Sequence, residues 1–475
     1  MNQQPAWIGG KAVTTDQSID IENPFSGELV GQVPLCGERE VEAACQAALE
    51  VLERDDLRQY QRAQILDRAA VLLSEQKEDF AQLITAESGK TISGARGEVG
   101  RCIDTLSFAA ATARHLKGEM IASDASVAGQ GKLTMALRVP VGVIAAITPF
   151  NFPLNLVAHK IAPALAAGCP VVLKPAPQTP LTALKFIALL REAGMPADWV
   201  SVLTDRGAEA AAPLVAHEIP RLITFTGSCT VGWMIAAQAP KKKVSLELGS
   251  NSPLIIEPDA DLKAIAAKVR VAGFANGGQS CIAVQRILVH ESVEAVFREE
   301  LLQAIDRIVV GDPTNDSTEV GPLIRSSENL RVSEWLEEAV EAGGTVIKGG
   351  TAKDGVFQPT VVDNVPRDCK LWTDEIFGPV VAMRSYSTLD EAIALANEGT
   401  LKLHVGLFTQ DIDKALGALR KLDFGGVLIN EVPTSRLDQQ PYGGILDGGN
   451  TREGPEYAVE EMTELKYVSF QAGRP

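Results

Sequence analysis

The residues most able to do chemistry in this sequence are thiols in glycine-rich turns. Cys281 ends the segment Asn276-Gly277-Gly278-Gln279-Ser280-Cys281, so little side-chain bulk surrounds its sulfur. A thiol among free backbone amides can have a lowered pKa and act as a nucleophile. Cys229 lies in its own glycine turn, directly after Gly227-Ser228, and meets the same criterion. Spacing alone leaves both cysteines as candidates.

Two polar residues at strand ends could complete such a site. Glu247 lies in Leu246-Glu247-Leu248-Gly249, at the end of an apolar run. There it is either a buried base with a raised pKa or an ordinary turn partner. Asn151 lies between Pro149 and Pro153, so its amide could point at a developing oxyanion, or it could form an Asx turn. Residue types leave both alternatives open.

A further segment could bind phosphate. Gly227 follows a strand in Phe225-Thr226-Gly227-Ser228-Cys229 and opens a helix, where free amides can hold a pyrophosphate. The GxGxxG fingerprint occurs nowhere in the chain. By itself, the segment therefore favours a plain tight turn over a dinucleotide site.

The elements that must position these residues alternate between strand and helix in the middle of the chain. Strands are expected near 141–148, 170–174, 200–204, 221–226 and 243–248, with helices at about 154–167, 180–193, 207–216 and 230–239. This pattern predicts a doubly wound sheet, which binds ligands at the carboxyl ends of its strands. Helical stripes cover 38–52, 58–73, 79–88 and 94–115.

A second α/β region is expected from about residue 261. Its strands are predicted near 284–290, 345–348, 379–386, 403–408 and 427–430, and its helices at 261–275, 291–308 and 326–342. The length of 475 residues fits two or three domains.

Composition excludes several classes of protein. The net charge of −17 argues against nucleic-acid binding, and the only basic run is Lys241-Lys242-Lys243. Seven cysteines at irregular spacings, with no CxxC pair, predict neither disulfides nor a metal site, and favour a reduced, cytoplasmic protein. The start of the chain predicts no signal peptide. The uncharged stretch 139–158 is interrupted by prolines and asparagines, so no membrane span is expected.

Seven segments taken together resemble the aldehyde dehydrogenase superfamily, in its order and approximate spacing, from about residue 20 to the end. They are Phe150-Asn151-Phe152-Pro153, Lys174-Pro175-Ala176, Phe225-Thr226-Gly227-Ser228, Leu246-Glu247-Leu248-Gly249, Gly278-Gln279-Ser280-Cys281, Glu375-Ile376-Phe377-Gly378-Pro379 and Arg452-Glu453-Gly454. Any one of them would be weak evidence. Seven in one order make chance similarity very improbable.

The resemblance implies a catalytic role for five residues. Cys281 would attack the aldehyde, Asn151 would bind the oxyanion, and Glu247 would activate the water that hydrolyses the thioester. Lys160 and Glu453 match a proton-relay pair, although a plain ion pair is an equal alternative.

The resemblance also implies where the nicotinamide cofactor binds. The expected cofactor residues are Thr148, Lys174, Gly227, Ser228, Val231, Leu248, Glu375 and Phe377. Pro177 stands where many NAD-preferring relatives have a glutamate, so NAD is expected first and NADP stays possible.

The branch that the chain resembles oxidises small polar or anionic aldehydes of the lactaldehyde, sulfoacetaldehyde and phosphonoacetaldehyde type. The expected substrate residues are Arg101, Phe152, His159, Ser280 and Arg436. Ser280 replaces a second arginine that some relatives carry, which makes phosphonates and phosphates less favoured. The alternatives are an acylating enzyme that forms acyl-coenzyme A, which Glu247 disfavours, and a non-catalytic, crystallin-like relative.

By resemblance, the fold is α/β, with a Rossmann-type cofactor domain, an α/β catalytic domain and a small β oligomerisation extension. The expected bounds are 1–118 and 138–246 for the cofactor domain, 247–440 for the catalytic domain, and 119–137 with 459–475 for the extension. Alternating apolar residues at 132–139 and 465–470 predict exposed strands in that extension. A homodimer or homotetramer is therefore expected.

Overall fold

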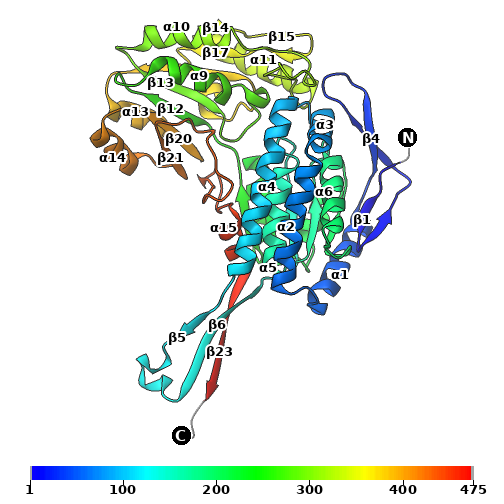
Figure 1. Ribbon diagram of the computed structural model, residues 1–475. Helices are drawn as coiled ribbons and strands as arrows, with labels where there is room; N and C mark the ends of the chain where they lie inside the picture. Colours follow the sequence, from blue (N-terminus) through cyan, green and yellow to red (C-terminus); the bar gives the residue numbers. More distant parts are fainter. Residues whose placement is uncertain (1–2, 472–475) are drawn as a thin grey trace.

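The chain folds into two α/β bodies and a projecting β extension (Figure 1). The computed structural model describes residues 3–471; residues 1–2, and residues 472–475 of the expected extension, lie outside the described part. The predicted α/β class, with Rossmann-like parallel sheets, is confirmed. The exact domain bounds stay a prediction.

The first sheet carries five parallel strands in the order β11 (Lys243–Glu247), β10 (Leu222–Thr226), β7 (Ile144–Ile147), β8 (Val171–Lys174) and β9 (Val200–Val202). Strands β7, β8 and β9 are buried along their whole length, which explains their unbroken apolar runs. The amino-terminal hairpin β1 (Ala6–Ile8) and β2 (Lys11–Val13) adds antiparallel strands at the β9 edge.

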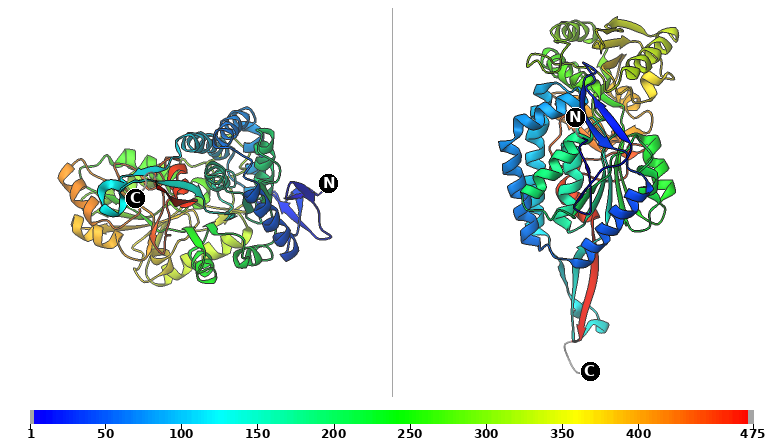
Figure 2. Two further views of the ribbon diagram at one scale, coloured as in Figure 1. Left: turned by 90° about the horizontal axis from the view of Figure 1, so that it is seen from below. Right: turned by 90° about the vertical axis from the view of Figure 1, so that its right-hand side faces the viewer.

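Helices cover both faces of this sheet, as the second panel of Figure 2 shows. They are α1 (Glu38–Arg54), α2 (Gln59–Glu75), α3 (Lys77–Ser88), α4 (Ile92–His115), α5 (Asn155–Ala167), α6 (Pro180–Glu192), α7 (Ala211–Ala216) and α8 (Cys229–Gln238). Helix α5 is buried on every side, because it packs between the sheet and helices α2, α4 and α15 (Pro455–Glu461). A hairpin of β3 (Ser18–Glu22) and β4 (Leu29–Pro34) lies outside these layers.

The second sheet has seven strands in the order β14 (Thr345–Lys348), β17 (Thr360–Asp363), β18 (Val380–Tyr386), β13 (Val284–His290), β12 (Ser252–Ile256), β20 (His404–Phe408) and β21 (Gly426–Ile429). Only β14 runs antiparallel to its neighbour. The associated helices are α9 (Leu262–Ala272), α10 (Glu294–Ile305), α11 (Ser326–Glu341), α12 (Lys370–Thr373), α13 (Leu389–Ala396) and α14 (Ile412–Lys421).

The extension is a three-stranded antiparallel sheet of β5 (Glu119–Ile121), β6 (Lys132–Pro140) and β23 (Thr463–Gln471). Figure 1 shows it reaching away from both bodies. Strand β6 lies between β5 and β23, so segments near residue 120 and near residue 465 join the same sheet. The three strands carry exposed apolar side chains at Met120, Ile121, Leu133, Leu137, Leu465, Tyr467 and Phe470. Strand β6 runs to Pro140 and β23 starts at Thr463, a few residues later than the expected bounds of the extension.

Strands β12 and β17 were not predicted. Pro253 lies inside β12, and a proline normally argues against a central strand. The pairing with β13 shifts register between Ser252 and Pro253, which accommodates the missing amide donor. Strand β17 follows Pro359 and a glycine-rich loop, and its four residues are too few to show a clear alternation of apolar and polar side chains.

No helix of residues 3–471 is long and apolar enough to cross a membrane.

Candidate active site

A cleft of about 1190 Å³ receives residues from both α/β bodies. A ligand site for a drug-sized molecule occupies roughly 300–1,000 Å³, so this cleft has room for a dinucleotide beside a small substrate. It is lined by thirteen of the residues singled out in the sequence: Arg101, Asn151, Phe152, Gly227, Ser228, Glu247, Leu248, Ser280, Cys281, Glu375, Phe377, Arg436 and Glu453.

Five other candidates do not line the cleft. Lys174 is buried and its Nζ lies 2.9 Å from Oδ1 of Asp205. Val231 faces outward on α8, and Thr148 is buried, with no partner for its Oγ1 within residues 3–471. The remaining two, His159 and Lys160, lie on buried α5 behind the cleft wall.

Cys281 is positioned by a turn that only glycine can form. Gly278 has φ of +70°, and an added Cβ would lie 2.1 Å from the carbonyl oxygen of Gly378. The Cys281 Sγ lies 2.8 Å from the hydroxyl of Tyr442. Burial raises the pKa of Cys281 to about 12, although the Tyr442 hydrogen bond opposes this. The expectation of a lowered thiol pKa is wrong here, because desolvation of the buried sulfur is the largest effect and raises the pKa.

Cys229 lies differently. It is the first residue of α8 and does not line the cleft. Burial raises the pKa of Cys229 to about 11, the same direction as for Cys281, so the pKa does not separate the two thiols and their position relative to the cleft does. Geometry, in addition to resemblance, therefore favours Cys281 as the nucleophile.

Asn151 is held against the same turn. Its Nδ2 donates to the carbonyl oxygen of Gln279 at 3.0 Å, two residues before Cys281. The Gln279 side chain is fixed in turn, because its Oε1 accepts from the Ile324 amide and its Nε2 donates to the Asn276 carbonyl. The Asn151 amide carries a second N–H, which is available for a ligand oxygen beside the sulfur.

Glu247 ends β11 with both carboxyl oxygens buried and without a partner among the described residues. Burial, together with the nearby charge of Glu453, raises its pKa well above the ordinary value. Glu453 is different, because Lys160 Nζ lies 3.6 Å away and Arg436 Nη2 donates at 2.9 Å. These two cations outweigh burial and lower the pKa of Glu453 to about 2. The pKa values of Glu247 and Glu453 are thus shifted in opposite directions.

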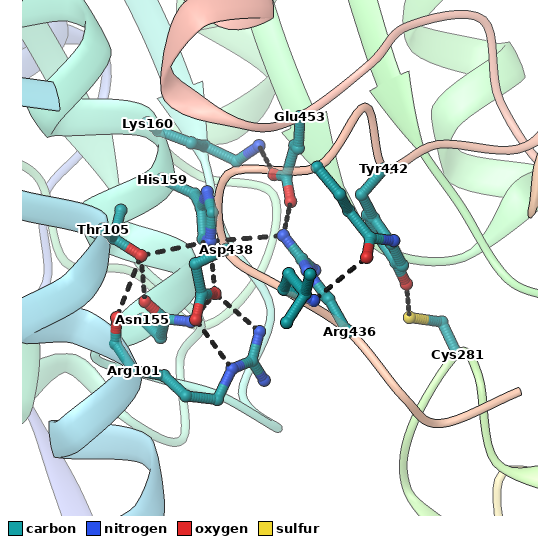
Figure 3. Close-up of polar contacts among 12 residues, drawn as sticks. Arg101, Thr105, Asn155, His159, Lys160, Cys281, Arg436, Asp438, Tyr442 and Glu453 are labelled. Carbon is teal, nitrogen blue, oxygen red and sulfur yellow. Dashed lines mark hydrogen bonds and ion pairs between the residues drawn. The ribbon is translucent and has the colours of Figure 1, made fainter. Parts of the chain in front are cut away.

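Asp438 is the centre of a buried cluster that the sequence did not reveal. It accepts from Arg101 Nε at 3.1 Å and Nη2 at 2.7 Å, from Asn155 Nδ2 at 3.0 Å, and lies 3.0 Å from His159 Nε2. Figure 3 shows Arg436 lying between this cluster and Tyr442. Asp438 and Tyr442 lie in a loop without periodicity. The acid two positions after Arg436 was the only available signal.

The opposite part of the cleft suits a dinucleotide. Gly227 and Ser228 lie at the start of α8, whose first turn receives no side-chain cap, so its amides are free for a pyrophosphate. Thr226 Oγ1 is buried there and has no hydrogen-bond partner in the described part of the chain. Phe377, with φ of +46°, meets Phe150 edge to face at 5.9 Å, and burial raises the pKa of Glu375 to about 7.

Within residues 3–471, no group of three His, Cys, Asp or Glu side chains could hold a metal ion.

Comparison with known proteins decides the family. The model of the "Aldehyde dehydrogenase family" matches residues 11–468. The chain belongs to this family. It is an NAD(P)-dependent aldehyde dehydrogenase, as the seven segments predicted.

Relatives are similar over their whole length. The chain is 40% identical to a 3-sulfolactaldehyde dehydrogenase of Priestia megaterium, and the match covers 98% of each chain. It is 36% identical to a lactaldehyde dehydrogenase of Methanococcus aeolicus, over 97% of this chain and 98% of the other. The crystal structure of aldehyde dehydrogenase 21 from Physcomitrella patens, in complex with the reaction product succinate, superimposes with a TM-score of 0.96 at 37% identity, covering 99% and 98% of the two chains.

Proposed function

We propose that this aldehyde dehydrogenase oxidises a short aldehyde that carries an anionic or hydroxyl group, and that it releases the free carboxylic acid. The relatives support this substrate class, since they include a 3-sulfolactaldehyde dehydrogenase and a lactaldehyde dehydrogenase. The complex of aldehyde dehydrogenase 21 with succinate supports it as well.

The observation that carries the proposal is the placement of Arg101. Its guanidinium lines the cleft with 30% of the side chain exposed, while Asp438 holds Nε and Nη2. Nη1 is left without a partner among the described residues, so it can donate to a carboxylate, sulfonate or hydroxyl oxygen. The ring of Phe152, which also lines the cleft, lies 5.7 Å from this guanidinium and forms an apolar surface beside it.

The chemistry follows from the groups around Cys281. The thiolate attacks the carbonyl carbon, and the carbonyl electron pair moves to oxygen, where Asn151 Nδ2 donates a hydrogen bond. A nicotinamide cofactor held in the cleft beside Gly227, Ser228 and Phe377 would supply the acceptor for the hydride of this carbon. Glu247 then takes a proton from the water that attacks the thioester, the C–S bond breaks, and the carboxylic acid departs. Burial without partners suits Glu247 to this task, because its raised pKa makes it a stronger base.

A steady-state aldehyde panel tests the proposal. The kcat/KM values of sulfoacetaldehyde, succinate semialdehyde, lactaldehyde and glycolaldehyde should exceed those of long alkanals and benzaldehyde, with NAD or NADP as cofactor. Much higher values for alkanals or benzaldehyde would refute it. Acyl-coenzyme A formed in the presence of coenzyme A would instead support the acylating alternative, and no turnover of any aldehyde would support a non-catalytic relative.

Arg101→Met sharpens the same test. Loss of a hydrogen bond to a charged group costs about 1.5–3 kcal/mol, so kcat/KM for the anionic aldehydes should fall about 10- to 150-fold and that for propanal far less. Arg39→Met serves as the control, because Arg39 is highly exposed and does not line the cleft. An equal loss for charged and neutral aldehydes would contradict a role of Arg101 in substrate binding.

We also propose a homodimer or homotetramer in the cytoplasm. The exposed apolar side chains of β5, β6 and β23 support association through the extension. The seven free thiols support a reducing compartment, and the net charge of −17 argues against nucleic-acid partners. Light scattering at micromolar concentration should give two or four chains; a monomer would contradict the proposal.

A further inference from the structure

The hydroxyl of Tyr442 is in hydrogen-bond contact with the sulfur of the nucleophile. The two atoms are 2.8 Å apart, and the side chain of Tyr442 is buried at 2% exposure. Cys281 Sγ is the only partner of that hydroxyl among the described residues. A buried hydroxyl with a single partner commits its hydrogen bond to that partner. Figure 3 shows this contact at the end of the Arg436 and Glu453 network.

The ring of Tyr442 is fixed from both sides. The Arg436 guanidinium lies 3.7 Å from the ring centroid, and the His404 ring meets it edge to face at 5.1 Å. His404 is itself held, because its Nδ1 lies 2.8 Å from the Pro433 carbonyl. The Tyr442 backbone exchanges hydrogen bonds with Glu453 at 3.1 and 2.6 Å. The hydroxyl therefore cannot turn away from the sulfur without disturbing this packing.

The charges around the pair set the direction of the hydrogen bond. The Tyr442 hydroxyl contacts Cys281, and Glu375, Arg436 and Glu247 line the same cleft as charged groups that act on the thiol pKa. The two carboxyl groups disfavour a thiolate, whereas Arg436 and the Tyr442 hydroxyl favour it. A cation on the face of the phenol ring makes its O–H a stronger donor and its oxygen a poorer acceptor. Donation from Tyr442 to sulfur is thus the favoured arrangement once Cys281 is ionised.

We propose that Tyr442 is a catalytic residue, whose hydroxyl donates a hydrogen bond to the Cys281 thiolate and to the sulfur that leaves when the thioester is hydrolysed. This rests on the proposed role of Cys281 as the nucleophile. In the first step the sulfur lone pair forms the C–S bond and the hydrogen bond is given up. In the last step the C–S bond breaks, its electron pair returns to sulfur, and the Tyr442 hydroxyl again donates to it. The Tyr442 proton stays on oxygen throughout.

The rate at which iodoacetamide alkylates Cys281, in the free enzyme and without substrate, tests the proposal. A hydrogen bond of this kind lowers a thiol pKa by about 1–2 pH units. A thiol of higher pKa is intrinsically more nucleophilic, which cancels about half of the logarithmic effect. Tyr442→Phe keeps the ring and should slow alkylation at pH 8 about 3- to 10-fold, with the labelled cysteine identified by peptide mass.

Two further variants separate a hydrogen bond from packing. Tyr386→Phe is the matched control, since the Tyr386 hydroxyl lies outside the cleft, within hydrogen-bond distance of two acceptors, the Ile256 carbonyl and the Glu257 carboxylate. The alkylation rate of this variant should equal that of wild type. Incorporation of 3-fluorotyrosine at position 442 gives a more acidic phenol and should speed alkylation, which a merely structural role would not do.

The outcomes are distinct from those of the proposed function. Unchanged alkylation of Cys281 in Tyr442→Phe, or slower alkylation with 3-fluorotyrosine, would overturn the role of Tyr442 and leave the reaction standing. Turnover that survives Cys281→Ser would overturn the proposed reaction and, with it, the catalytic meaning of the contact.

Discussion

Neutralising Glu453 should make Glu247 a weaker base and move the enzyme's pH profile. Glu453 is a charged neighbour that raises the pKa of Glu247, and it also offsets Lys160 and Arg436, which lower it. Two like charges about 6–10 Å apart interact by about 1.7–2.8 kcal/mol at an effective dielectric constant of about 20, or about 1–2 pH units. Glu453→Gln removes this repulsion and unmasks both cations. Both effects lower the pKa of Glu247.

The assay is the pH dependence of thioester hydrolysis. Glu247 must be deprotonated to activate water, so the rate falls on the acid side as Glu247 gains a proton. A burst of reduced nicotinamide followed by a slower steady phase shows that a step after hydride transfer limits turnover. Release of the carboxylic acid from the pre-formed thioester is then measured in single turnover from pH 5.5 to pH 9. In Glu453→Gln, the acid limb should move to lower pH by about 1–2 pH units.

The control for this experiment is Glu456→Gln, because Glu456 is exposed on the first turn of α15. Removing one partner of a buried ion pair costs about 3–5 kcal/mol, so Glu453→Gln should also melt at lower temperature, and folding is checked by circular dichroism. An acid limb that stays in place, or that moves to higher pH, would refute the electrostatic coupling of the two acids.

Three other substitutions have defined outcomes. Asn151→Ala should lower kcat about 100- to 1,000-fold, as loss of one oxyanion donor does, and a loss below tenfold would exclude that role. Gly278→Ala should slow the iodoacetamide labelling of Cys281 relative to wild type and lower the melting temperature, because the new Cβ meets the Gly378 carbonyl. A wild-type melting curve would contradict this. Cys229→Ser should keep wild-type kcat/KM, because Cys229 lies outside the cleft; a loss comparable with that of Cys281→Ser would show otherwise.

The sequence predicted the layered fold well, because periodicity records burial. The five parallel strands of the first sheet were expected within a few residues of their observed bounds, since most of them are apolar runs between turn residues. Pro253 hid β12, because the register shift that accommodates it depends on a partner strand thirty residues away in the chain. Strand pairing of that kind leaves no pattern in the local sequence.

The candidate site was predictable only in part. Motifs pointed to Cys281, Asn151 and Glu247, and the fold brings all three to one cleft. Asp438 and Tyr442 were missed because their importance comes from what they touch, not from their spacing. The prediction of a lowered pKa for Cys281 was wrong. The sequence of a glycine turn indicates free backbone amides, but it does not indicate how far the sulfur is desolvated. The roles of Lys174, Val231 and Thr148 in cofactor binding stay predictions.

Trapping the acyl-enzyme tests the central claim most directly. Glu247→Gln mixed with NAD and sulfoacetaldehyde should stop at the thioester, so intact-protein mass should rise by one acyl group and peptide mapping should place it on Cys281. Hydroxylamine should remove it. An acyl group on Cys229, or no acyl group while Cys281→Ser still turns over substrate, would contradict the account.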